Sequence, residues 1–154
     1  MEEAFMKLAI AQAEKALKQN EVPVGAVIVL YGKVIAKAHN KRQTNGDASA
    51  HAEIIAIRKA CKKIGGWRLL DCDMYVTLEP CAMCAGAAIN SRLKNIFFGA
   101  YDEKSGCCGT IYNLPEDKRF NHVVKVTGGV LEKECATILS KFFSNKRKSK
   151  EKAN

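Results

Sequence analysis

The chain has 154 residues, which suits one domain with a sizeable hydrophobic core and leaves little room for a second. Its 25 Lys and Arg residues outnumber its 16 Asp and Glu residues, and this formal charge of +9 favours polyanionic partners without specifying one. No apolar run is long enough to span a membrane, and Met1-Glu2-Glu3 leads directly into an amphipathic pattern, so we expect neither a membrane protein nor a signal peptide.

In the first half of the chain, hydrophobic spacing predicts a helix, a β-hairpin and a second helix. Apolar residues recur at helical spacing near the N-terminus, and the run Val24–Leu30 lacks alternation, as expected of a strand buried on both faces. Trp67, after two glycines, is expected to plug the core. In chain order, the predicted elements are a helix over 2–19, strands over 24–30 and 34–39, a loop over 40–50 and a helix from 51 to the glycine pair at 65–66.

The second half continues the alternation of strands and helices, which predicts a three-layer α/β/α sandwich around a mixed sheet of about five strands. Its predicted elements are strands over 73–78, 95–100 and 123–127, and helices over 80–90 and 131–143. We expect one domain over residues 1–144, followed by a basic tail over 145–154 in which five Lys and Arg residues face one Glu. Such a tail is either a solvated, frayed end or an attractor of polyanions.

Two short motifs carry the chemistry, namely His51-Ala52-Glu53 and Pro80-Cys81-Ala82-Met83-Cys84. Cys81 and Cys84 are separated by one helical turn, so their sulfurs can converge on one ion. His51 can supply a third ligand from the start of the preceding helix. His51 and Glu53 can both reach that ion only if they lie in an irregular first turn, because residues two apart do not share a face of a helix.

The number of ligands indicates a catalytic metal site. One His and two Cys leave tetrahedral zinc one open position for water, whose pKa the ion lowers toward about 7. Glu53 is then a proton carrier beside that water instead of a ligand. Seven cysteines, an odd number in a chain without a leader, favour the reducing cytoplasm over a disulfide framework.

His-x-Glu followed by Pro-Cys-x-x-Cys is the signature of the zinc nucleobase deaminases. Over nearly its whole length the sequence resembles the bacterial tRNA-specific adenosine deaminases of the cytidine and nucleotide deaminase superfamily. The matching stretches are 21–27, 51–54, 75–86, 98–100, 134–136 and 142–143. The resemblance implies a cytidine-deaminase-like fold, a cytoplasmic homodimer, one zinc ion per chain and an anticodon stem-loop substrate, with arginine tRNA as the expected one. The wobble adenosine of that loop would become inosine.

Carried over residue by residue, the resemblance makes His51, Cys81 and Cys84 the zinc ligands and Glu53 the catalytic proton shuttle. It further implies that five residues contact substrate: Asn40, Ala52, Ala100, Asp102 and Phe143. From the residues alone, Asn40 is a turn-forming Asn before a loop, and Asp102 is a loop carboxylate. Adjacent helix positions diverge by about 100°, so we expect Phe142 inside and Phe143 near RNA.

Three other functions remain open at this point. A deaminase of free nucleosides or bases, such as cytidine or guanine, would share the zinc site. A zinc-stabilised RNA-binding module without catalysis would leave Glu53 and the open ligand position unused. A redox protein would use the Cys-x-x-Cys pair as a reversible disulfide. Cys107-Cys108 is either a loop pair prone to oxidation or the source of a further zinc ligand that would close the site.

Overall fold

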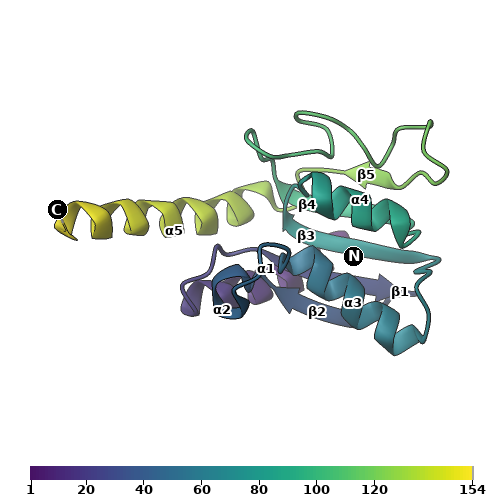
Figure 1. Ribbon diagram of the computed structural model, residues 1–154, viewed down its shortest axis with the longest axis horizontal. Helices are drawn as coiled ribbons and strands as arrows, with labels where there is room; N and C mark the ends of the chain where they lie inside the picture. Colours follow the sequence, from purple (N-terminus) through teal and green to yellow (C-terminus); the bar gives the residue numbers. More distant parts are fainter. Residues whose placement is uncertain (154) are drawn as a thin grey trace.

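A computed structural model describes residues 1–153 and confirms the three-layer α/β architecture. Helices α1 and α5 lie on one face of a five-stranded sheet, and α3 and α4 lie on the other (Figure 1). The strands are β1 (Gly25–Leu30), β2 (Lys33–His39), β3 (Cys72–Leu78), β4 (Asn95–Ala100) and β5 (Lys125–Thr127). The helices are α1 (Glu2–Lys18), α2 (Arg42–Asn45), α3 (Ala52–Ile64), α4 (Ala82–Asn90) and α5 (Glu132–Ala153).

The sheet is mixed, and its strand order is β2-β1-β3-β4-β5. Strand β1 pairs antiparallel with both β2 and β3, whereas β3, β4 and β5 run parallel. Strand β2 therefore points the same way as β3 and β4. The carboxyl ends of these three strands lie at one end of the molecule, and α3 and α4 both begin there (Figure 1).

Strand β1 lies at the centre of the core, as its continuous apolar sequence predicts. Its first five residues are buried, with helices on both faces of the sheet. Gly25 permits the close approach of α1, because a Cβ atom there would overlap the backbone of Ala9 and Ala13. In the rest of the core, small residues such as Ala56, Ala85 and Ala88 let α3 and α4 pack closely.

Three features differ from the sequence-based expectation. The loop after β2 contains the short helix α2, which has no buried residue and so left no hydrophobic pattern to detect. Trp67 is 51% exposed and does not plug the core, and the guanidinium groups of Arg68 and Arg92 lie over its ring at 4.4 and 5.5 Å.

Among residues 1–153, no helix is both long and apolar enough to cross a membrane.

The third difference is the length of the last helix. Helix α5 was expected over residues 131–143, but it continues to Ala153 and projects from the body of the protein (Figure 1). Lys, Arg and Glu are good helix formers, and no Gly or Pro interrupts the segment after residue 143. The basic residues therefore lie on a helical extension.

Candidate active site

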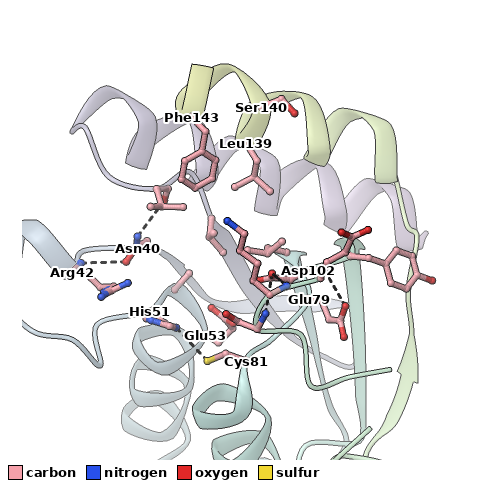
Figure 2. Close-up of a pocket in the computed structure, with 18 of the residues that line it drawn as sticks. Asn40, Arg42, His51, Glu53, Glu79, Cys81, Asp102, Leu139, Ser140 and Phe143 are labelled. Atoms are coloured by element: carbon pink, nitrogen blue, oxygen red, sulfur yellow. Dashed lines mark hydrogen bonds between the residues drawn. The ribbon is translucent and has the colours of Figure 1, made fainter. Parts of the chain in front are cut away.

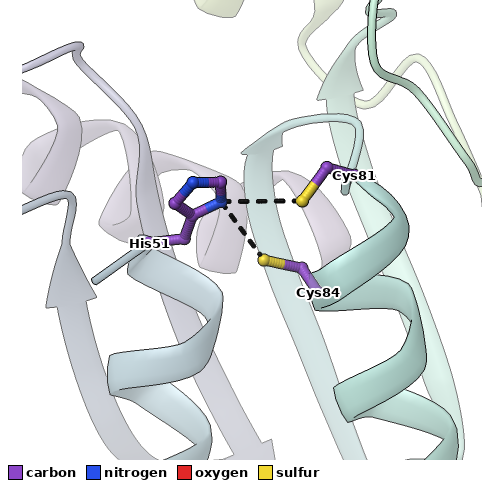
Figure 3. A group of neighbouring side chains, drawn as sticks. All are labelled: His51, Cys81 and Cys84. Carbon is purple, nitrogen blue, oxygen red and sulfur yellow. Dashed lines mark hydrogen bonds between the residues drawn. The ribbon is translucent and has the colours of Figure 1, made fainter. Parts of the chain in front are cut away.

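Three potential metal ligands meet at the amino ends of α3 and α4. His51 and Cys81 are the N-cap residues of these helices, and both have extended backbone conformations. The Nδ1 atom of His51 lies 3.6 Å from Sγ of Cys81 and 3.4 Å from Sγ of Cys84 (Figure 3). Because His51 precedes the helix and Glu53 lies in its first turn, both side chains reach the same place.

The donor set and its dimensions fit zinc. Bonds of about 2.05 Å to nitrogen and about 2.3 Å to sulfur place the N and S atoms of a tetrahedral zinc site about 3.6 Å apart. The separations of 3.6 and 3.4 Å in the structure agree with that value. Within residues 1–153, the cluster of possible ligand atoms within 4.8 Å of one another comprises only His51, Cys81 and Cys84. Neither Cys107 nor Cys108 joins it, so these side chains leave a fourth position free.

The two cysteines differ in how readily they lose a proton. The Cys84 thiol donates a hydrogen bond to the sulfur of Cys81, and this lowers the pKa of Cys81 to about 3. The same hydrogen bond, followed by burial, raises the pKa of Cys84. The free N–H groups at the start of α4 also favour a thiolate. A metal ion held by both sulfurs would displace the proton that Cys84 retains in this arrangement.

Glu53 is a buried carboxyl group beside these ligands, with its side chain next to that of Cys84. It is 4% exposed, and burial raises its pKa above the ordinary value for glutamate. Burial therefore favours the protonated form of this carboxyl group, and a group that exchanges a proton with its neighbours can act as a general acid and base.

His51, Glu53 and Cys81 form the floor of a pocket of about 830 Å³ (Figure 2). Asn40, Ala52, Asp102 and Phe143 also line it, so four of the five expected substrate residues lie at one site. Its other lining residues are Val22, Val24, Arg42, Leu78, Glu79, Tyr101, Glu103, Lys104, Ser105, Leu139, Ser140 and Arg147.

Ala100, the fifth expected residue, is absent from the pocket lining and is 4% exposed at the end of β4. Its carbonyl accepts the N–H of Glu79 at 2.8 Å. Phe142 is 9% exposed and Phe143 is 42% exposed, which matches the expected inward and outward orientations.

Asn40 is 5% exposed and has a fixed orientation. Its Nδ2 donates to the carbonyl of Val22 at 3.3 Å, and its Oδ1 accepts the N–H of Arg42 at 3.2 Å. The turn-forming role inferred from the sequence is therefore present. An amide has two N–H donors and two lone pairs, so this side chain keeps hydrogen-bonding capacity toward the pocket.

A buried carboxylate that the motif analysis did not single out supports one rim of the pocket. Glu79 is 2% exposed and accepts the N–H groups of Asp102, Cys108 and Thr110 at 3.1, 3.0 and 3.0 Å, as well as the hydroxyl of Thr110. Gly106 packs so closely on this carboxylate that a Cβ atom there would overlap it. The only signal for this role was an acidic residue at the end of a buried apolar run.

A second buried carboxylate, Glu21, supports the opposite rim. It is 1% exposed and accepts the N–H of Gln43 at 3.1 Å and the N–H and hydroxyl of Thr44 at 2.6 Å each. These contacts cap the amino end of α2 and fix the segment that carries Asn40 and Arg42. No local pattern around residue 21 indicates this role, because its partners lie more than 20 residues away.

Comparisons with known proteins agree with the geometry. The sequence profile of MafB19-like deaminases matches residues 1–147. A tRNA-specific adenosine deaminase from Bacillus subtilis (strain 168) is 52% identical over 152 residues, which cover 99% of this chain and 94% of that protein. A tRNA-specific adenosine deaminase from Haemophilus influenzae is 45% identical over 150 residues, covering 97% of this chain and 87% of that protein.

Solved structures show the same relationship. A structure from studies of A-to-I editing by tRNA deaminases at the wobble position of transfer RNA has a TM-score of 0.85 and 43% identity, covering 88% of this chain and 99% of that chain. A guanine deaminase from Bacillus subtilis has a TM-score of 0.62 and 44% identity, covering 64% of each chain. The full-length agreement in sequence and fold is with the first of these. The chain therefore belongs to the family of tRNA-specific adenosine deaminases, among the MafB19-like deaminases.

Proposed function

We propose that this protein hydrolyses adenosine to inosine at the wobble position of a tRNA anticodon. The observation that carries the proposal is the placement of Glu53, a buried carboxyl group with a raised pKa, beside a three-ligand cluster on the floor of a large pocket. A structural zinc site is normally closed by a fourth side chain, and no fourth ligand joins this cluster within residues 1–153. The identity of 52% to a tRNA-specific adenosine deaminase supplies the substrate class.

In the proposed mechanism, His51, Cys81 and Cys84 hold one zinc ion per chain. When bound, zinc lowers the pKa of a coordinated water toward about 7. Glu53 accepts a proton from the attacking water, whose oxygen adds to C6 of adenine. Glu53 passes this proton to the ring nitrogen next to C6. It then takes the second proton from the hydroxyl now on C6 and passes it to the amine, so the C6–N bond breaks, ammonia leaves and the C6 carbonyl of inosine forms. The fixed amide of Asn40 orients the base by hydrogen bonding.

The walls of the pocket suit a nucleotide extruded from an RNA loop. Extrusion costs less from a loop than from a duplex, and an exposed aromatic ring can stack on an unpaired base. Phe143 offers such a ring, and Arg147, one helical turn further along α5, lines the same pocket. Ala52 and Asp102 complete the proposed contacts with the substrate. Ala100 is assigned an indirect role, because it holds Glu79 beneath the Asp102 loop.

The remaining parts of the proposal concern organisation and location. Residues 1–144 form the catalytic domain. The basic tail over 145–154, of which residue 154 lies outside the described residues, attracts RNA. The protein acts in the cytoplasm on the anticodon stem-loop of arginine tRNA, and its seven free cysteines suit that compartment. It functions as a homodimer. Helix α4 suits an interface because it has no charged residue and carries the 39% exposed side chain of Met83.

Guanine deamination is the second candidate, because a solved guanine deaminase is 44% identical over 64% of the chain. The two functions share the metal cluster and differ in what reaches the pocket. The basic α5 helix beside the pocket favours RNA over a free base.

The decisive experiment compares substrates. Zinc-loaded protein is incubated with arginine tRNA bearing a wobble adenosine, and in parallel with guanine, cytidine and adenosine. Nuclease digestion and mass spectrometry are used to measure inosine. We expect inosine at the wobble position from the wild type and none from Glu53→Gln, which should retain its zinc. Ammonia release from guanine alone would replace the proposal with the second candidate, and an active Glu53→Gln protein would remove the proton-shuttle role.

A further inference from the structure

Three lysines gather around His39 at the carboxyl end of the edge strand β2. The imidazole of His39 lies 3.5 Å from Oε1 of Gln12 on α1 and 3.2 Å from Oε1 of Gln19, the C-cap residue of that helix. Lys15 lies between these glutamines at helical spacing, so it occupies the same face of α1. The face of α1 that contacts His39 therefore also carries a cation.

The other two lysines approach the same place from α3 and from the loop. Lys59 of α3 donates to the carbonyl of Lys37 at 2.8 Å, two residues before His39. Lys41 follows His39 by two residues. Burial lowers the pKa of His39 most, and the charges of Lys41, Lys15 and Lys59 lower it further. The pKa of Lys59 is likewise lowered first by burial and then by the charges of Lys41 and Lys15. The four groups are therefore electrostatic neighbours.

Within the described part of the chain, no acidic side chain forms an ion pair with these lysines. The only ion pair within residues 1–153 joins Arg119 to Asp117. Glu21 faces His39, but it is buried and its oxygens accept hydrogen bonds from Gln43 and Thr44. Protection of the sheet edge is a common role for lysines on an edge strand, yet Lys15 and Lys59 belong to helices. Like charges held together without a counterion favour an anionic partner.

The position of this group indicates which anion binds there. Because β2 runs parallel to β3, its carboxyl end lies at the pocket end of the sheet. Lys41 is followed directly by Arg42, which lines the pocket beside Asn40, while Phe143 of α5 lies across the pocket (Figure 2). Positive charge therefore extends from the pocket rim along the side away from α5. A polyanion whose target base lies in the pocket can continue over this surface.

We propose that Lys15, Lys41 and Lys59 form a phosphate-binding site for the RNA backbone that flanks the target nucleotide. We call these three residues the β2-end lysine site. It holds the strand on the side of the pocket opposite α5. The inference rests on the proposed function for its choice of ligand.

The test uses two triple variants of the full-length, zinc-loaded protein. Lys15→Gln/Lys41→Gln/Lys59→Gln removes the site. Lys33→Gln/Lys62→Gln/Lys94→Gln removes the same charge from exposed positions near the start of β2, the end of α3 and the start of β4, at the opposite end of the sheet. Binding of a fluorescent anticodon stem-loop RNA is measured by anisotropy over a range of salt concentrations. The kcat and KM for inosine formation are measured on the same preparations.

We expect the site variant to bind RNA more weakly than the control and to raise KM with little change in kcat. Its slope of log affinity against log salt should flatten by about 2, because each lost phosphate contact on a single strand removes about 0.7. Substitution of the same three residues by Arg should restore binding, which separates charge from any effect on folding.

Equal binding and equal salt slopes for the two Gln triples would overturn the β2-end lysine site. Failure of the Arg triple to bind better than the site Gln triple would also overturn it. A wild-type protein that forms no inosine would contradict the proposed function, whereas the binding comparison would still decide the lysine site.

Discussion

Cys84 and Cys72 are both fully buried, but only Cys84 places its sulfur within ligand distance of His51. Burial raises the pKa of Cys72 to about 11, which keeps it a neutral thiol in β3. We therefore expect Cys84→Ser to lose the stoichiometric zinc and the activity, and the matched change Cys72→Ser to keep both. Metal content per chain by mass spectrometry checks this. One zinc per chain in Cys84→Ser would contradict the proposed ligand set.

At the residue level, the sequence predicted side chains that belong to a short motif. His51, Glu53, Cys81 and Cys84 could be predicted because their spacing along two helix starts already requires convergence. Glu21 and Glu79 could not, because each is defined by partners more than 20 residues away. The sequence also could not show that Asp102 lines the pocket whereas Ala100 is buried behind the pocket lining.

At the level of elements, α2 depends on a polar contact instead of on hydrophobic burial. Burial alone raises the pKa of Glu21, but hydrogen bonds from Thr44 and Gln43 outweigh it and lower that pKa. We expect Glu21→Gln to reduce the free energy of unfolding at pH 7 by about 1.5–3 kcal/mol, the contribution of a hydrogen bond to a charged group. Denaturant unfolding with Glu14→Gln as an exposed control measures this difference.

The pH dependence of that difference follows from the sign of the shift. A carboxyl group whose pKa is lower in the folded state stabilises the protein above its unfolded pKa of about 4.3. The stabilisation is lost as the pH falls through the lower, folded-state pKa. The gap between wild type and Glu21→Gln should therefore be constant near neutral pH and close in acid. A gap that widens in acid would contradict this role for Glu21.

The loop after β4 forms the other rim, and Gly106 is its tightest point. A Cβ atom at Gly106 would overlap the Glu79 carboxylate and the carbonyl of Asp102, whereas one at Gly66 would meet no atom within 4 Å. We expect Gly106→Ala to displace the rim and lower kcat/KM for RNA by at least about 10-fold, which corresponds to 1.4 kcal/mol. Gly66→Ala should behave as the wild type. Zinc content should stay at one per chain in both, and an unchanged kcat/KM for Gly106→Ala would contradict a supporting role for this contact.

Elements with a hydrophobic face were predicted well, and elements without one were not. The run from Val24 to Leu30 and the alternation of strands and helices predicted the buried β1 and the layered sheet. Helix α2 and the distal half of α5 have no buried apolar stripe in their sequences, so periodicity could not detect them. Trp67 lies at the surface instead of in the core, and its ring is contacted by its chain neighbour Arg68 and by Arg92, which only the tertiary structure brings near it.

For the molecule as a whole, the distribution of charge matters more than its total. The formal charge is +9, yet the described residues contain a single ion pair, so most cations are free to meet an anionic partner. The distal turns of α5 and the β2-end lysine site both lie at the pocket end of the sheet (Figure 1). An RNA loop would therefore be attracted toward the catalytic end from two sides.

The contribution of the α5 extension to that attraction can be isolated with Lys148→Gln/Lys150→Gln/Lys152→Gln. These side chains are exposed and form no part of the core, and Gln has nearly the helix propensity of Lys, so the melting temperature should not change. RNA binding should weaken and its salt slope should flatten, because counterion release scales with the number of phosphates contacted. Arg147 is retained because it lines the pocket, so kcat at saturating RNA should stay near that of the wild type. If this variant binds RNA with the same salt dependence as the Lys33→Gln/Lys62→Gln/Lys94→Gln control, the helical extension does not contact the RNA backbone, and the attraction must come from the pocket rim and the β2-end lysine site.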